Sequence, residues 1–120
     1  MLIRPITDHF GFNNTASTAV HKTLPNQAVY SGTKFAVRAI SEGLRQEAGD
    51  KLRVTIISPG FVKTPFVDTV ANAEVRAQLA ASRDKMAIPP DAIARAIAFA
   101  IQQPTEVDVS EIIVRPIAQG

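Results

Sequence analysis

Cysteine and tryptophan are absent from this chain of 120 residues. Without cysteine, the chain can form no disulfide, no thiolate metal site and no cysteine nucleophile. The absence agrees with a cytoplasmic location, where disulfides are rare. No second histidine or carboxylate cluster accompanies His9 at metal-binding spacing, so we expect no metal site.

Neither sign of charge dominates, because 13 lysines and arginines balance 11 aspartates and glutamates to a formal net charge of +2. With no basic run and only 6% aromatic residues, the chain lacks the pattern of a nucleic-acid-binding protein. No apolar run approaches membrane-spanning length, and residues 1–6 lack the apolar core and cleavage site of a signal peptide. We therefore expect at most one soluble domain, with no nucleic-acid and no membrane partner.

Tyr30 and Lys34 stand four residues apart at the start of a segment with a helical pattern. That spacing puts the phenol and the ammonium on one helix face, one turn apart. A tyrosine normally keeps its proton to about pH 10. A positive charge beside it favours the phenolate, so the pair can serve in acid/base chemistry. Such pairs are also common on solvated helices, where they are inert, so the surrounding motifs must decide.

The rest of the chain alternates apolar strands with helices. Residues 1–10 give no clear pattern and stay unassigned, whereas 11–17 are compatible with a short strand. A helix is expected from Pro25-Asn26 to about Ala48. The apolar stripe of this helix is predicted to be buried, and it consists of Ala36, Ile40 and Leu44, with Phe35 and Val37 alongside.

Residues 52–58 form the clearest strand, because their nearly continuous apolar run suits a strand covered on both faces. A short helix is expected over 72–81 and another from Pro89-Pro90 to Gln102, with a core stripe of isoleucines. A last buried strand covers 111–115. Strands joined by helices predict right-handed crossovers and an α/β fold with a partial, three-stranded Rossmann-like parallel sheet. Three strands make a thin sheet, so we expect the chain to be part of a larger domain.

Four segments in register carry a family resemblance. Residues 30–37 (Tyr-Ser-Gly-Thr-Lys-Phe-Ala-Val) resemble the active-site helix of the short-chain dehydrogenases/reductases. Ser17 lies thirteen residues before Tyr30, at the offset of that family's catalytic serine. Residues 59–64 (Pro-Gly-Phe-Val-Lys-Thr) are similar to the family's nicotinamide segment, and 110–116 resemble the closing strand of members acting on small hydroxy acids and related alcohols. The resemblance covers roughly residues 11–119.

The resemblance implies a role for each matching residue. Tyr30 would exchange a proton with the substrate oxygen, Lys34 would support Tyr30 and hold the nicotinamide ribose, and Ser17 would orient the substrate. The cofactor, NAD or NADP, would be bound by Tyr30 and Lys34 and by a further set of residues in the nicotinamide segment: Pro59, Gly60, Val62 and Thr64. On local sequence alone, Ser17 could instead be a turn hydroxyl, Thr64 a helix cap and Pro59-Gly60 a strand terminator.

The Gly-rich turn that receives the cofactor pyrophosphate has no counterpart here, because the six glycines show no G-x-G spacing. Residues 11–120 are thus expected to be the C-terminal part of a short-chain dehydrogenase domain. The first hypothesis is an NAD(P)-dependent oxidoreductase for a small alcohol or carbonyl compound, inactive or impaired as this truncated chain. The alternative is a non-catalytic remnant that serves as an oligomerisation or interaction module. In this family the Tyr30 helix and the C-terminal helix and strand pack against neighbouring subunits, so a homo-oligomer is expected.

Overall fold

The computed structural model describes residues 2–3, 10–18 and 25–119. Its centre is a four-stranded sheet in the order β1-β2-β3-β4, made of Leu2–Ile3, Phe10–Thr15, Leu52–Pro59 and Glu111–Val114. Strands β2, β3 and β4 are parallel, as predicted, and β1 adds a short antiparallel edge that pairs with Gly11 and Phe12. The three predicted strands are therefore confirmed, and the unassigned N-terminal segment contributes a fourth.

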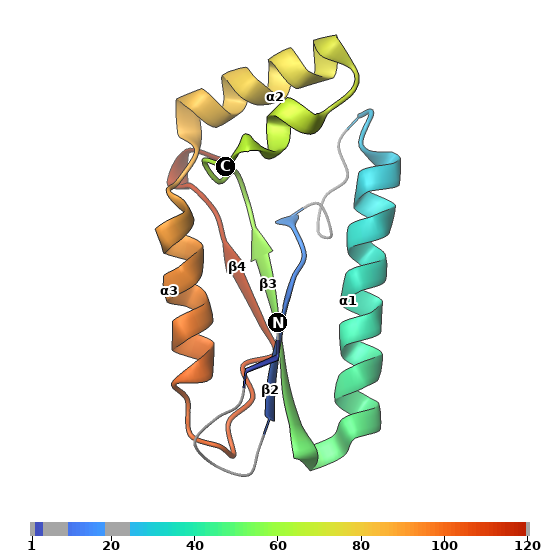
Figure 1. Cartoon of the computed structure of the whole chain (residues 1–120), viewed down its shortest axis with the longest axis vertical. Helices are drawn as coiled ribbons and strands as arrows, with labels where there is room; N and C mark the ends of the chain where they lie inside the picture. The colour runs from blue at the N-terminus through green and yellow to red at the C-terminus, as the bar shows by residue number, and fades with distance from the viewer. Residues whose placement is uncertain (1, 4–9, 19–24, 120) are drawn as a thin grey trace.

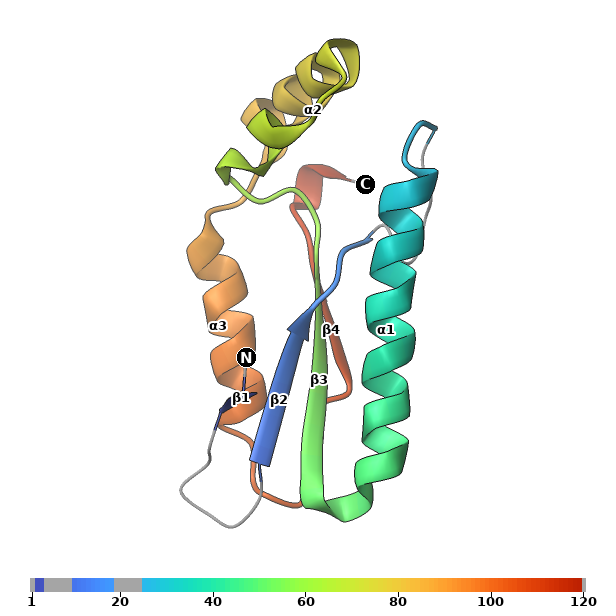
Figure 2. The same ribbon diagram turned by 45° about the vertical axis from the view of Figure 1, so that its right-hand side comes forward.

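Among the described residues, three α-helices accompany the sheet: α1 (Ala28–Ala48), α2 (Ala73–Met86) and α3 (Pro90–Ile101). Figures 1 and 2 show α1 and α3 on opposite faces of the sheet, with α2 lying across the end where β3 finishes. Helix α2 begins where Asn72 caps it, its side chain accepting a hydrogen bond from the Val75 N–H at 3.0 Å, and it extends beyond the predicted 72–81. None of the helices in the described residues 2–3, 10–18 and 25–119 is long and apolar enough to cross a membrane.

The two helical crossovers have opposite hands. Both steps, β2 to β3 and β3 to β4, join parallel neighbours in the same direction along the sheet, yet α1 and α3 lie on opposite faces. The expectation that every crossover is right-handed is thus wrong for one of them. The rule that crossovers are right-handed applies to a strand that leads directly into a helix packed back on the sheet. The connection from β3 to α3 instead leaves the sheet through a 3-10 helix (Pro65–Thr69) and α2.

Strand β3 forms the core, as its apolar run predicted. Residues 53–58 are all buried, and Val54 and Ile57 are completely inaccessible to solvent. Ile56 packs with Ala16, and Val37 of α1 lies against this pair. Arg53 is also buried, because its guanidinium donates to the carbonyls of Ile101, Gln103 and Pro104 at the end of α3.

The predicted buried stripe of α1 is wrong in its main members. Ile40 is 67% exposed, and Phe35 and Ala36 are exposed as well. The face toward the sheet carries Ser31 and Ser41, both buried, together with the half-buried Val37 and Leu44. The buried Ser41 hydroxyl has two hydrogen-bond partners: it donates to the Val37 carbonyl at 2.8 Å and accepts from the Asn14 amide at 3.1 Å.

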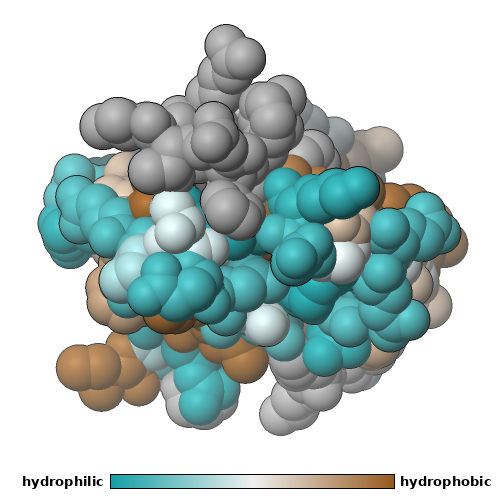
Figure 3. All heavy atoms as spheres, turned by 90° about the horizontal axis from the view of Figure 1, so that it is seen from below, coloured by the Kyte–Doolittle hydropathy of each residue, from teal (hydrophilic) through white to brown (hydrophobic). Residues whose placement is uncertain are grey.

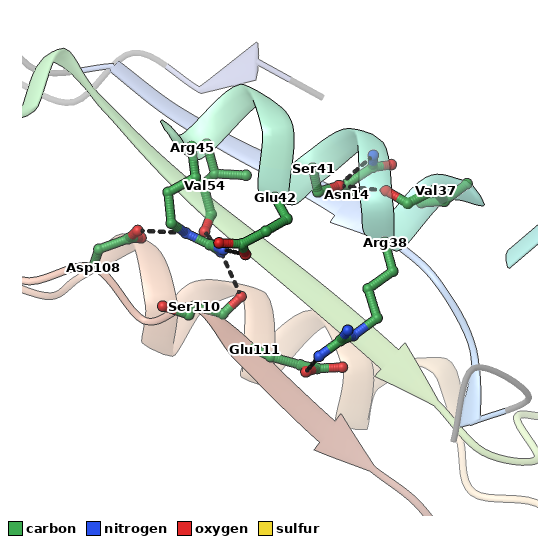
Figure 4. Close-up of polar contacts among 10 residues, drawn as sticks. All are labelled: Asn14, Val37, Arg38, Ser41, Glu42, Arg45, Val54, Asp108, Ser110 and Glu111. Atoms are coloured by element: carbon green, nitrogen blue, oxygen red, sulfur yellow. Dashed lines mark hydrogen bonds and ion pairs between the residues drawn. The ribbon is translucent and has the colours of Figure 1, made fainter. Parts of the chain in front are cut away.

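Arg45 fastens the far end of α1 to the sheet, as Figure 4 shows. Its guanidinium donates to the carbonyls of Val54 and Ser110 and forms ion pairs with Glu42 and Asp108. Two turns back, Arg38 pairs with Glu111 at 3.4 Å, and Glu111 also accepts from the buried Ser58 hydroxyl. Seen from below, away from α2, the described surface is mainly hydrophilic (Figure 3).

Candidate active site

The predicted site residues gather at the carboxyl end of the parallel strands. Ser17 follows β2, Pro59-Gly60 closes β3, and Tyr30 lies in the first turn of α1. Helix α1 runs opposite to β2 and β3, so its beginning lies beside the ends of those strands (Figures 1 and 2). This end of a parallel sheet is where α/β proteins bind their ligands.

Tyr30 and Lys34 lie next to one another on α1, as their spacing predicted. The Lys34 ammonium nitrogen is 5.8 Å from the centre of the Tyr30 ring, within the range of a cation–π contact. Both residues are half-buried. The Thr33 hydroxyl donates to the Tyr30 carbonyl at 2.7 Å, which ties down the backbone at the start of the helix.

Ser17 is held by its neighbours at the end of β2. Ala16 is buried, and its N–H donates to the Ile57 carbonyl at 2.7 Å, which extends the pairing of β2 with β3. On the other side, the Thr18 hydroxyl lies 3.5 Å from the Gln119 amide nitrogen. Ser17 itself is half-buried between these two anchors.

Residues 60–63 continue past β3 in an ordered path. The Gly60 N–H donates to the Val114 carbonyl at 2.8 Å, and Val62 forms a parallel bridge with Ile88. In that bridge the Phe61 carbonyl and the Lys63 N–H bond to Ile88, so the N–H and C=O of Val62 point away from Ile88. A ligand that binds the Val62 backbone would therefore approach from the side away from Ile88.

Beyond this segment, an open pocket of about 330 Å³ lies between the 3-10 helix and α2. Its lining residues are Lys63, Thr64, Pro65, Asp68, Arg83 and Asp84. Arg83 donates to the Thr64 carbonyl at 3.4 Å and pairs with Asp84 at 3.1 Å, so α2 supports the backbone at Thr64. No sequence pattern indicates Arg83, because an arginine on an exposed helix has no recognisable signature. The described residues contain no group of three or more potential metal ligands.

Comparison with known proteins decides what this arrangement belongs to. The family model described as short chain dehydrogenase matches residues 13–75, which include Ser17, Tyr30, Lys34 and the segment after β3. The chain belongs to the short-chain dehydrogenase family. An uncharacterized oxidoreductase of Staphylococcus saprophyticus is 50% identical over 110 residues, covering 89% of this chain and 44% of the relative. Human dehydrogenase/reductase SDR family member 11 is 33% identical over 111 residues, or 88% and 43% of the two chains.

Solved short-chain dehydrogenases have the same fold. An alcohol dehydrogenase from the archaeon Thermococcus sibiricus, complexed with 5-hydroxy-NADP, matches with a TM-score of 0.74 and 25% identity over 92% of this chain and 43% of that one. A small-chain dehydrogenase in complex with NADPH matches with a TM-score of 0.70 and 25% identity over 88% of this chain and 49% of its own. The chain thus spans less than half the length of the curated relatives it matches.

The residues present fit one end of a dinucleotide. The Val62 backbone and the Thr64 side chain follow β3 at the end of the sheet where Tyr30 and Lys34 lie, which suits a nicotinamide and its ribose. Among the described residues, however, no Gly-rich turn joins a strand to a helix N-terminus to receive the pyrophosphate. The fit is limited to the nicotinamide side.

Proposed function

We propose that this chain carries the proton-transfer residues and the nicotinamide side of an NAD(P)-dependent oxidoreductase for a small alcohol or carbonyl compound. The observation that carries the proposal is the Tyr30–Lys34 pair, its ring and ammonium 5.8 Å apart at the carboxyl end of the sheet. Membership of the short-chain dehydrogenase family and oxidoreductase relatives support it. Because the chain has no cysteine, we also propose a cytoplasmic location.

In this proposal Tyr30, Lys34 and Ser17 have distinct tasks. The Tyr30 hydroxyl gives its proton to the substrate oxygen during reduction and takes it back during oxidation. The Lys34 ammonium stabilises the phenolate that Tyr30 becomes and binds the ribose hydroxyls. The Ser17 hydroxyl donates to the same substrate oxygen and orients it.

The cofactor side of the proposal rests on the segment after β3. Pro59 and Gly60 lead the chain off the sheet, the Val62 backbone would contact the carboxamide of the cofactor, and the Thr64 hydroxyl would hydrogen-bond to it. When bound, NAD or NADP supplies or accepts the hydride. The neighbours solved with 5-hydroxy-NADP and NADPH support a nicotinamide cofactor.

A chimera tests these roles. It joins the N-terminal half of the Staphylococcus saprophyticus relative to residues 11–120 of this chain, and NADPH oxidation is followed with 2,3-butanedione as the carbonyl probe. We expect turnover, and a loss of at least about 100-fold on Tyr30→Phe, since the general acid is removed. Phe35→Tyr, a change at an exposed position of the same helix, is the matched control and keeps the activity. A folded chimera without turnover, or one indifferent to Tyr30→Phe, contradicts the proposal.

By itself the 120-residue chain is proposed to bind the nucleotide weakly and to be inactive or impaired. The pyrophosphate of a dinucleotide binds at a helix N-terminus that follows a Gly-rich turn, and the described residues offer no such turn. Titration with NADPH, followed by nicotinamide fluorescence, checks this. Micromolar binding by the chain alone would overturn this part of the proposal.

A second candidate function is a homo-oligomerisation module, favoured by the outer face of α1. Val29 and Ile40, eleven residues apart and therefore on one side of the helix, are 83% and 67% exposed on a helix whose other face packs on the sheet. We propose that a second copy of the chain covers this face, since the same apolar residues on both copies complement each other about a two-fold axis. The C-terminal helix and strand, with Phe99 and Ile113 about half exposed, offer a further contact.

Light scattering, which measures the mass of the particle in solution, tests the oligomerisation module. Ile40→Lys is expected to shift a dimer to monomer, because it puts a charge into an apolar contact. Val107→Lys, at an exposed valine outside these helices, is the matched control and leaves the mass unchanged. A wild-type chain that stays monomeric at high concentration refutes the module.

A further inference from the structure

The 3-10 helix Ile117–Gln119 folds back over the carboxyl ends of β2 and β3. It follows β4 through the buried Pro116, and it lies near the end of β3 in both ribbon views (Figures 1 and 2). Ile117 is fully exposed, whereas Gln119 is half-buried and directs its carboxamide inward. The polar side chain is thus the one that this turn presents to the sheet.

The Gln119 carboxamide contacts both segments of the candidate site. Its oxygen accepts the Phe61 N–H at 2.9 Å, just after β3 has ended. Because an N–H donor requires an acceptor, this bond fixes the amide orientation and directs the amide nitrogen the other way. That nitrogen lies 3.5 Å from the Thr18 hydroxyl, a long contact at the limit of hydrogen bonding.

Gly60 explains why the carboxamide can come so close. A Cβ built on Gly60 would lie 2.1 Å from the Gln119 side-chain oxygen and 2.9 Å from its amide carbon. The carboxamide therefore occupies the space that any other residue at position 60 would fill. Gly60 was predicted from the sequence as a cofactor residue, and the structure adds this packing requirement.

We propose that Gln119 is a positioning residue, which locks the Ser17–Thr18 segment after β2 to the Gly60–Phe61 turn after β3. It does not touch the reacting atoms. On one side, Ser17 lies between Ala16, which is bonded to β3, and Thr18, which contacts Gln119. On the other side, Val62 directly follows Phe61, whose N–H Gln119 accepts. The carboxamide thereby sets the spacing between the hydroxyl that orients the substrate and the backbone that faces the nicotinamide. Its catalytic meaning rests on the proposed function, since a misplacement of about 1 Å can cost a 100-fold loss of rate.

The test is amide hydrogen exchange and amide chemical shifts of the 120-residue chain. Gln119→Met keeps the length of the side chain and removes both contacts, so the Phe61 N–H is expected to exchange roughly five- to tenfold faster. The Lys63 N–H, bonded to Ile88, is the internal reference and keeps its rate. The amide shifts of Ser17 and Thr18 are expected to move as well.

Thr18→Val separates the two contacts. It removes the hydroxyl that lies 3.5 Å from the Gln119 amide nitrogen and leaves the Gln119 oxygen to accept the Phe61 N–H. We expect the slow exchange of Phe61 to be kept while the amide shift of Ser17 moves. Gln103→Met is the matched control, because Gln103 makes a hydrogen bond to Phe99 within the α3 end of the chain. It is expected to change neither readout.

Two results overturn the proposal. One is unchanged Phe61 exchange in Gln119→Met. The other is equal acceleration at Gly60, Phe61 and Lys63, which would mean that Gln119 only stabilises the fold. Neither readout needs bound nucleotide, so failure of the chimera to turn over would refute the proposed function and leave this result intact.

Discussion

Replacing glycine by alanine at two positions of this chain is expected to change stability in opposite directions. At Gly60 a new Cβ would lie 2.8 Å from the Arg115 Cβ and 2.1 Å from the Gln119 side-chain oxygen. The glutamine can swing away, but the Arg115 Cβ is fixed to the backbone directly after β4, so the end of the sheet must shift. We expect Gly60→Ala to lower the free energy of unfolding by about 1–3 kcal/mol, the usual cost of overpacking.

At Gly43 the same substitution meets open space, because nothing lies within 4 Å of the added Cβ. Gly43 is inside α1, where alanine is favoured over glycine by about 0.5–1 kcal/mol. Gly43→Ala should therefore raise the free energy of unfolding by that amount. Urea unfolding followed by circular dichroism measures both variants under identical conditions.

The double variant Gly60→Ala with Gln119→Ala refines the test. Shortening Gln119 removes the clash with its carboxamide but leaves the one with Arg115, so only part of the lost stability is expected to return. If Gly60→Ala is as stable as the wild type, the close approach of Gln119 and β4 to Gly60 is refuted. If Gly43→Ala destabilises, the open space beside α1 is refuted.

Three further outcomes follow from single contacts. Arg53→Met should lower the free energy of unfolding by about 2 kcal/mol, because three carbonyls near the end of α3 lose a charged donor. Arg95→Met, which removes only an exposed pair with Asp91, should stay within about 0.5 kcal/mol in the same urea assay. Ser41→Ala should cost about 1–2 kcal/mol by urea unfolding, since the Asn14 amide loses its acceptor; an unchanged value would contradict that contact.

The sheet could be predicted because its strands have strong local patterns. The apolar run from Leu52 is continuous and rich in β-branched residues, and the structure makes it the buried central strand. The Tyr30–Lys34 pair could be predicted because it depends only on helical geometry, and the structure brings the two side chains together. The roles of Ser17, Val62 and Thr64 remain proposals, although the structure puts all three at the carboxyl end of the strands.

The features that sequence missed depend on tertiary contacts. Both faces of α1 carry apolar residues, so periodicity could not tell that Ser31 and Ser41 would face the sheet while Ile40 faces outward. The opposite hands of the crossovers follow from a long connection that the general rule does not cover. Gln119 contacts Thr18 and Phe61 only because 3-10 turns and strand ends far apart in the sequence meet at one edge.

The bridge between Val62 and Ile88 has an evolutionary consequence. The bridge joins the segment just after β3 to the segment just before α3. The stretch between them, which includes α2, is therefore a module whose two ends are held together. Mutation, insertion or deletion within that module would leave the strand pairing untouched. The length and sequence of this module can therefore vary independently of the sheet and of the start of α1.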